Sequence, residues 1–172
     1  LLALGMLPLS VLAQTDFPSK PVKLVVPFAA GGSTDLVARV IADGMRSTLG
    51  QAVVVDNRGG AGGMLGTEAV SLAAPDGYTI GMATASTMTV NPALYPKAEG
   101  INAKLQPLVN LVSMPSVYMV HPGMGVKDFA GFIAALKAQP GHYSAAVPGI
   151  GSLGQIMVES FNDTLGVKMA NV

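Results

Sequence analysis

The stretch "PVKLVVPFAAGGSTDLVARVIADGM" (residues 21–45) decides the fold. Its first eight residues form a short run of apolar and β-branched side chains, which predicts a buried parallel strand. A loop of small residues follows, and Ser33, Thr34 or Asp35 is expected to cap the helix that comes next. That helix is expected to end at Gly50. The stretch therefore predicts a strand, a glycine-rich loop and a helix in that order.

The same order recurs along the chain. A second strand is predicted at 52–57, a glycine-rich turn running into a helix at 58–74, and a third strand at 78–86. This β-α-β-α-β order is typical of an α/β fold with a parallel sheet covered on both faces. The glycines of 59–66 indicate a tight turn and close helix–strand packing. Further elements are expected as strands at 108–114 and 116–122, a helix at 126–139, a strand at 142–147, a helix from Ser152 to about Leu165, and the start of a strand at 167–172.

Composition excludes several classes of protein. Half of the 172 residues are apolar and 12% are charged, which is enough apolar material for a core and too much for a disordered chain. Ten basic residues balance ten acidic ones, so neither nucleic acid nor an anionic membrane is an expected partner. Cysteine is absent, and His121 and His142 lack a nearby ligand pattern, so no metal site is predicted.

The first residues, "LLALGMLPLSVLAQ" (1–14), differ from the rest. They are apolar and contain a small-residue cleavage pattern at 11–13, as in the hydrophobic region and cleavage site of a secretory signal. Pro8 argues against a buried first helix, and the segment is too short to span a bilayer. Residues 1–13 are therefore interpreted as a signal-peptide remnant, and the mature chain is expected to be exported.

Two glycine-rich loops share one design. In "VVPFAAGGSTDLVARV" (25–40) and "SAAVPGIGSLGQIMV" (144–158), an apolar strand runs into proline, small residues, glycine and a serine that opens a helix. Such loops place main-chain N–H groups and the positive end of a helix at the C-terminal edge of a sheet, where open α/β sheets bind ligands. The pair predicts a site for an anion that needs no charged side chain.

The second loop also matches G-x-G-x-x-G at Gly149–Gly154, so an NAD-binding oxidoreductase is an alternative. The dinucleotide fingerprint needs an acidic residue about twenty positions further on, and none follows in 168–172. Asp56 ends the second predicted strand, but the first loop lacks the fingerprint's glycines. No serine has a base near it in sequence, and no nucleophile motif occurs. The chain is therefore expected not to be an enzyme and to need no cofactor.

Five blocks in order, "PSKPVKLVVPFAAGGSTDLVARVIADGM", "VVVDNRGGAGGMLGTEAV", "PDGYTI", "NPALY" and "PGIGSLG", cover the chain from about Phe17 onward. Together they resemble the tripartite tricarboxylate transporter substrate-binding proteins, also called Bug receptors. The resemblance implies a two-lobed periplasmic-binding-protein fold of type II with mostly parallel sheets flanked by helices. Members are about twice this length, which implies a first lobe at 14–107 without its C-terminal return and a truncated second lobe at 108–172.

The resemblance also implies a function. Such receptors lie in the periplasm, capture a small organic carboxylate (a di- or tricarboxylate, an amino acid or an aromatic acid) and deliver it to the subunits of a membrane permease. The protein is then expected to be a monomer without cofactor. An exported ligand sensor for a membrane kinase would use the same site, and the sequence does not separate it from a transport receptor.

In the family, main-chain N–H groups and bridging waters from two loops, one per lobe, hold the ligand carboxylate. Carried onto this chain, the implied ligand-binding residues are Phe28, Ala29, Ala30, Gly31, Gly32, Ser33, Thr34 and Asp35 in the first loop, Ser86, Thr87 and Asn91 as pocket wall after the third strand, and Gly149, Gly151 and Ser152 in the second loop. Asp35 is expected to organise its loop rather than to contact the ligand.

Overall fold

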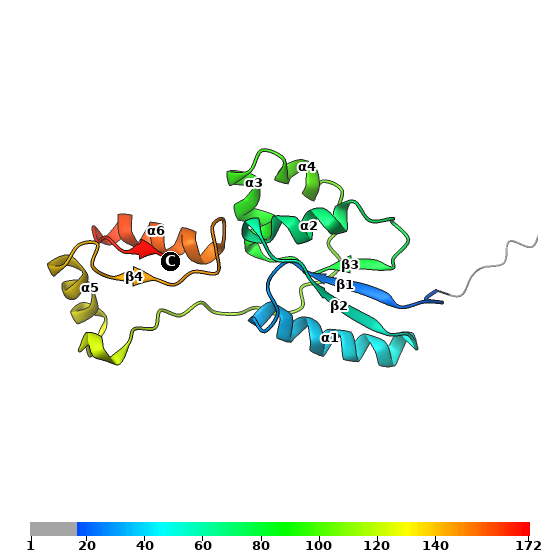
Figure 1. Cartoon of the computed structure of the whole chain (residues 1–172), viewed down its shortest axis with the longest axis horizontal. Coiled ribbons are helices and arrows are strands. Elements are labelled where there is room, and N and C mark those ends of the chain that lie inside the picture. The colour runs from blue at the N-terminus through cyan, green and yellow to red at the C-terminus, as the bar shows by residue number, and fades with distance from the viewer. Residues whose placement is uncertain (1–16) are drawn as a thin grey trace, which may run out of the picture.

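The computed structural model describes residues 17–172, so the predicted signal remnant, residues 1–13, lies outside the described residues. Two α/β bodies are joined by a long extended segment (Figure 1). We call residues 17–102 the first lobe and residues 122–172 the second lobe. Within residues 17–172, no helix combines the length and the hydropathy needed to cross a bilayer.

The first lobe is built on a three-stranded parallel sheet in the order β2-β1-β3. Strand β1 (Val22–Val26) lies in the centre, between β2 (Val53–Asn57) and β3 (Thr79–Gly81). Helix α1 (Ser33–Leu49) follows β1, and α2 (Met64–Ser71) covers the other face of the sheet (Figure 1). The predicted α/β fold with a parallel sheet covered on both faces is confirmed.

The core of this lobe lies between β1 and α1. Leu24 and Val26 of the strand pack on Ala38 and Ala42 of the helix, and all four are buried. On the opposite face α2 approaches the chain closely, because a Cβ on Gly66 would lie 2.6 Å from the Cα of Pro27. The interpretation of the glycine-rich turn as close helix–strand packing is confirmed.

The first lobe continues with short helical segments. They are the turn η1 (Ala61–Gly63), the π-helical turn η2 (Ser86–Val90), α3 (Asn91–Leu94) and α4 (Ala98–Asn102). The predicted third strand was too long, since β3 ends at Gly81. Ser86 and Thr87 therefore lie in the π-helical turn η2 rather than at a strand end.

The second lobe contains η3 (Pro122–Met124), α5 (Phe129–Ala138), β4 (Ser144–Ala145), α6 (Leu153–Leu165) and β5 (Ala170–Asn171). Strands β4 and β5 pair in parallel. Phe132, Leu136, Val158 and Met169 form its core. The predicted helices and strands of 126–172 are confirmed in order and type, but β4 and β5 are shorter than the strands predicted at 142–147 and 167–172.

Two further expectations were wrong. The strands predicted at 108–114 and 116–122 are extended but unpaired, because no strand among residues 17–172 lies beside them to accept a ladder of hydrogen bonds. Helix α1 is not capped by Ser33, Thr34 or Asp35. Its N-cap is Gly32, without a side-chain hydrogen bond to the helix end, and Asp35 is used instead to bond the loop. The predicted end at Gly50, in the left-handed conformation, is confirmed.

Candidate functional site

Three loops of the first lobe leave the same edge of the sheet, because all three strands are parallel. They follow β1, β2 and β3, and they pack on one another through glycine. A Cβ on Gly59 would lie 3.2 Å from the Ala29 N atom, and one on Gly63 would lie 2.7 Å from the Thr87 Cγ2 atom. The three loops therefore lie against one another at the C-terminal edge of the sheet, where open α/β sheets bind their ligands.

The first glycine loop presents unused donors. Residues 29–33 are exposed, and the N–H groups of residues 32–34 have no acceptor within the described part of the chain. They belong to the N-terminal end of α1, where the helix dipole favours negative charge. These groups can donate to a carboxylate without a lysine or arginine in the loop.

Asp35 holds this loop in shape. This residue is 2% exposed, and its carboxylate accepts hydrogen bonds from Gly31 N–H (2.8 Å), Arg39 Nε (3.0 Å) and Asn57 Nδ2 (3.0 Å). The Asn57 amide also donates to the Phe28 carbonyl oxygen at 3.2 Å. The carboxylate of Asp35 thus holds Gly31 directly and Phe28 through the Asn57 amide, which agrees with the expected role of Asp35 as loop organiser.

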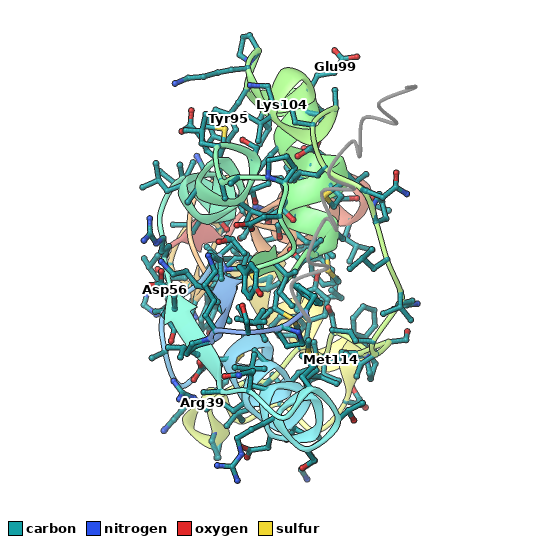
Figure 2. The ribbon with its side chains drawn as sticks, turned by 90° about the vertical axis from the view of Figure 1, so that its right-hand side faces the viewer. Arg39, Asp56, Tyr95, Glu99, Lys104 and Met114 are labelled. Atoms are coloured by element: carbon teal, nitrogen blue, oxygen red, sulfur yellow. The ribbon has the colours of Figure 1, made fainter. Side chains whose placement is uncertain are left out.

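Arg39 and Asn57 were not among the residues predicted for the site. Arg39 lies one helical turn after Asp35, and Asn57 ends the neighbouring strand, so the i, i+4 spacing was the only local signal. Figure 2 shows Arg39 and Asp56 on one side of the first lobe, on α1 and β2. Asp56 is paired there with Arg58 Nε (2.9 Å) and Lys23 Nζ (3.9 Å). This agrees with structural pairing rather than with the ribose contact of a dinucleotide site.

We expect stability to depend on the charge of Asp35. The hydrogen bond from Arg39, followed by those from Gly31 and Asn57, lowers the pKa of Asp35 to about 2. Because this pKa is lower in the folded chain than in the unfolded chain, the charged carboxylate stabilises the fold fully at pH values above about 4, the ordinary pKa of an aspartate. This stabilisation is lost as the pH falls from about 4 toward 2. Urea unfolding of the full-length protein between pH 7 and pH 2.5 should show that slope.

Asp35→Asn should flatten the slope and lower stability at pH 7, because the amide cannot accept from three donors as the carboxylate does. Asp43→Asn is the control, since Asp43 is an exposed carboxylate of the same helix with no ion pair within residues 17–172. An equal slope in wild type and Asp35→Asn would contradict the assigned role.

Two N–H groups of the second glycine loop, those of Gly151 and Ser152, are occupied. Ser152 is the N-cap of α6, as predicted, and its Oγ accepts from Gln155 N–H at 3.2 Å. Gly151 N–H donates to Gln155 Oε1 at 2.8 Å, and Ser152 N–H donates to the Gly149 carbonyl at 3.1 Å. A carboxylate that binds Gly151 N–H must displace the side chain of Gln155. Sequence reasoning missed Gln155, although Ser-x-x-Gln before an apolar run is a capping-box pattern.

The second glycine loop meets η1, η2 and Tyr95 of the first lobe at a contact that we call the seam between the lobes. Leu153 N–H, at the start of α6, donates to Ser86 Oγ in η2 at 2.9 Å. A Cβ on Gly62 would lie 2.8 Å from the carbonyl carbon and oxygen of Gly151, and one on Gly151 would lie 3.0 Å from the Tyr95 hydroxyl. Figure 1 shows the start of α6 directed toward the first lobe, and Figure 2 labels Tyr95 at the end of α3. Gly62 and Tyr95 are further seam residues that the sequence did not indicate.

The structure thus brings two of the predicted wall residues, Ser86 and Asn91, to the second loop. Ser86, Asn91 and Ser152 are buried at the seam. Thr87 is also buried, and its Oγ1 is satisfied within its own turn by Thr84 O (3.1 Å) and Thr84 N–H (3.0 Å). Within residues 17–172 no group of three His, Cys, Asp or Glu side chains could hold a metal.

Comparison with known proteins gives one consistent family. Residues 37–172 match the sequence profile described as "Tripartite tricarboxylate transporter family receptor". The chain is 37% identical over 147 residues to BugT of Bordetella pertussis, covering 84% of this chain and 45% of BugT. The chain spans about half the length of the curated relatives it matches.

Solved structures with a similar fold point to the same family. The fold superposes on MatC from Rhodopseudomonas palustris, determined with bound malate, with a TM-score of 0.83 and 34% identity. It superposes on the periplasmic binding protein BugD with a TM-score of 0.70 and 31% identity. The superpositions cover 91% of this chain, with 53% of MatC and 52% of BugD.

Proposed function

Because this chain belongs to the tripartite tricarboxylate transporter receptor family, we propose that the whole protein captures a small organic carboxylate in the periplasm and delivers it to a membrane permease. The family consists of periplasmic solute-binding receptors, not enzymes. The proposed ligand is a di- or tricarboxylate, an amino acid or an aromatic acid. The proposed partners are the permease subunits, with the receptor acting as an exported monomer.

One observation carries this proposal: the second glycine loop contacts η1 and η2, which lie at the same edge of the first lobe's sheet from which the first glycine loop leaves β1. Each glycine loop opens a helix, and neither 28–35 nor 148–154 contains a lysine or arginine. The first loop has unused N–H groups, and the second has N–H groups held by neutral acceptors that an anion can replace. The bound malate of the related MatC supports a carboxylate as ligand.

The favoured route for binding follows from these contacts. A carboxylate first bonds the exposed N–H groups at the start of α1, because they require no displacement. The second lobe then closes, and α6 meets Ser86 across the seam. Binding energy is in this way coupled to lobe closure, which is the signal that a permease reads.

Thermal unfolding of the full-length protein without residues 1–13 tests the function. We expect one class of acid in a panel of dicarboxylates, tricarboxylates, acidic amino acids and aromatic acids to raise the unfolding temperature. A ligand at about 100 times its Kd adds about 2.7 kcal/mol of stability. NAD serves as the control, because the dinucleotide alternative predicts a shift with NAD alone. A shift with NAD and with none of the acids would overturn the proposal.

A further inference from the structure

Asn91 carries an unused hydrogen-bond acceptor. It begins α3, it is 1% exposed, and its Nδ2 donates to the Gly62 carbonyl oxygen at 3.2 Å. Its Oδ1 is buried and has no donor within residues 17–172. The amide orientation is fixed by Gly62, because exchanging the two amide atoms would set two acceptor oxygens against each other.

This oxygen faces the seam between the lobes rather than the core of the first lobe. A Cβ on Gly62 would lie 3.0 Å from Asn91 Oδ1, and a Cβ on Gly151 would lie 3.4 Å from it. The Tyr95 hydroxyl lies 3.0 Å from that same Cβ position on Gly151. Movement of the second loop away from Asn91 therefore uncovers Oδ1 beside the proposed ligand site.

We propose that Asn91 selects ligands that carry a hydrogen-bond donor in addition to their carboxylate. The proposal rests on the proposed carboxylate-receptor function and narrows its substrate class. A buried amide oxygen without a donor destabilises the closed state, and a ligand that supplies the donor removes that penalty. A site built to bond a ligand hydroxyl rejects the analogue that lacks it, since its own polar group is then left unpaired.

The fitting ligands are hydroxy acids and amino acids. A hydroxyl and an ammonium group can each donate to Oδ1, and the ammonium forms the stronger, charge-assisted bond. A ligand whose only polar groups are carboxylates offers Oδ1 nothing but further acceptors. Asn91 is therefore assigned to the far part of the ligand, while the loop N–H groups hold its carboxylate.

Matched acids test this assignment by calorimetric titration of the full-length protein. Succinate, malate and aspartate share one dicarboxylate skeleton, to which malate adds a hydroxyl and aspartate an ammonium group. Glutarate, 2-hydroxyglutarate and glutamate form a longer set, and propionate, lactate and alanine a shorter one. In the set that binds, we expect the acid with a donor to bind about ten- to a hundredfold more tightly than its plain analogue.

Asn91→Leu should reduce that preference to about threefold or less, because leucine keeps the volume and removes the acceptor. Asn102→Leu is the matched control. Its amide donates to the Thr87 carbonyl at 3.0 Å within the first lobe, so its loss should leave the preference unchanged. If Asn91→Leu does not fold, the side-chain amide resonance of Asn91 in wild type replaces it. That resonance should shift with the donor-bearing acid and not with its plain analogue.

The outcomes separate the two proposals. Equal affinity for plain and donor-bearing acids overturns the role of Asn91 while leaving the receptor function intact. The role of Asn91 is also overturned by a preference that persists in Asn91→Leu, or by an Asn91 resonance that shifts equally with both acids. Absence of binding by every acid, including those without a matched analogue, overturns the carboxylate-receptor function itself, and the role of Asn91 with it.

Discussion

Gly32→Val is expected to abolish carboxylate binding while leaving the unfolding temperature nearly unchanged. The backbone of Gly32 (φ −79°, ψ 170°) is extended and accepts a β-branched side chain. A Cβ there would meet only the Ala29 carbonyl oxygen, at 3.7 Å, which is an ordinary contact. The valine would instead cover the free N–H groups at the start of α1. Losing two charge-assisted hydrogen bonds corresponds to about a hundredfold or more in Kd.

Titration with the acid found in the ligand panel, beside thermal unfolding, measures both effects. Gly32→Ala should give an intermediate loss of affinity, since its single methyl group covers less of the loop. Gly44→Ala is the control, because Gly44 lies in the middle of α1 with nothing within 4 Å of its Cβ position. It should bind normally and gain slightly in stability. Unchanged affinity in Gly32→Val would remove the first loop from the site.

Gly151→Ala should also abolish binding, by a different route. Gly151 has φ +78°, and a Cβ would lie 3.0 Å from the Tyr95 hydroxyl and 3.4 Å from Asn91 Oδ1. The methyl group would therefore hold the second loop away from the first lobe, so that the lobes could not close on a ligand. We expect a loss of about a hundredfold in affinity, together with about 1–2 kcal/mol of backbone strain.

Gly166→Ala separates strain from closure. Gly166 ends α6 at φ +60°, and nothing lies within 4 Å of its Cβ position. This variant should lose a similar amount of stability and keep its affinity. Small-angle scattering with saturating acid should show compaction in wild type and in Gly166→Ala, and none in Gly151→Ala. Compaction of Gly151→Ala on adding the acid would refute the role of the seam.

Local patterns predicted the elements of the fold well. The run before Pro27, the glycine at position 50 and the serine at position 152 each act through their own neighbours, so strand, helix end and N-cap follow from a few residues. The segment 108–122 failed because an apolar, β-rich run becomes a strand only where a partner strand lies beside it. Its own residues carry no information about that partner.

The site was predictable only in part for the same reason. Both glycine loops have local signatures, but the seam joins residues that are far apart in sequence, such as Ser86 and Leu153, separated by 67 positions. Gly62 and Tyr95 look like an ordinary turn glycine and an ordinary aromatic until the second loop is placed against them. Asn57 and Gln155 hold the loops through side-chain hydrogen bonds. The same residue types form such bonds in ordinary surface turns, so the sequence did not single them out.

The contact between Gly62 and Gly151 is made by main chain on main chain. The surfaces that meet on closure therefore owe their shape to peptide geometry, which is the same for every residue type that leaves the backbone path unchanged. The preference for one ligand over another depends instead on side chains around that contact, such as Asn91. In such a receptor, a mutation can change which ligand is preferred without changing the main-chain contact through which the lobes close. Gene duplicates can diverge in nutrient preference while each keeps a working closure.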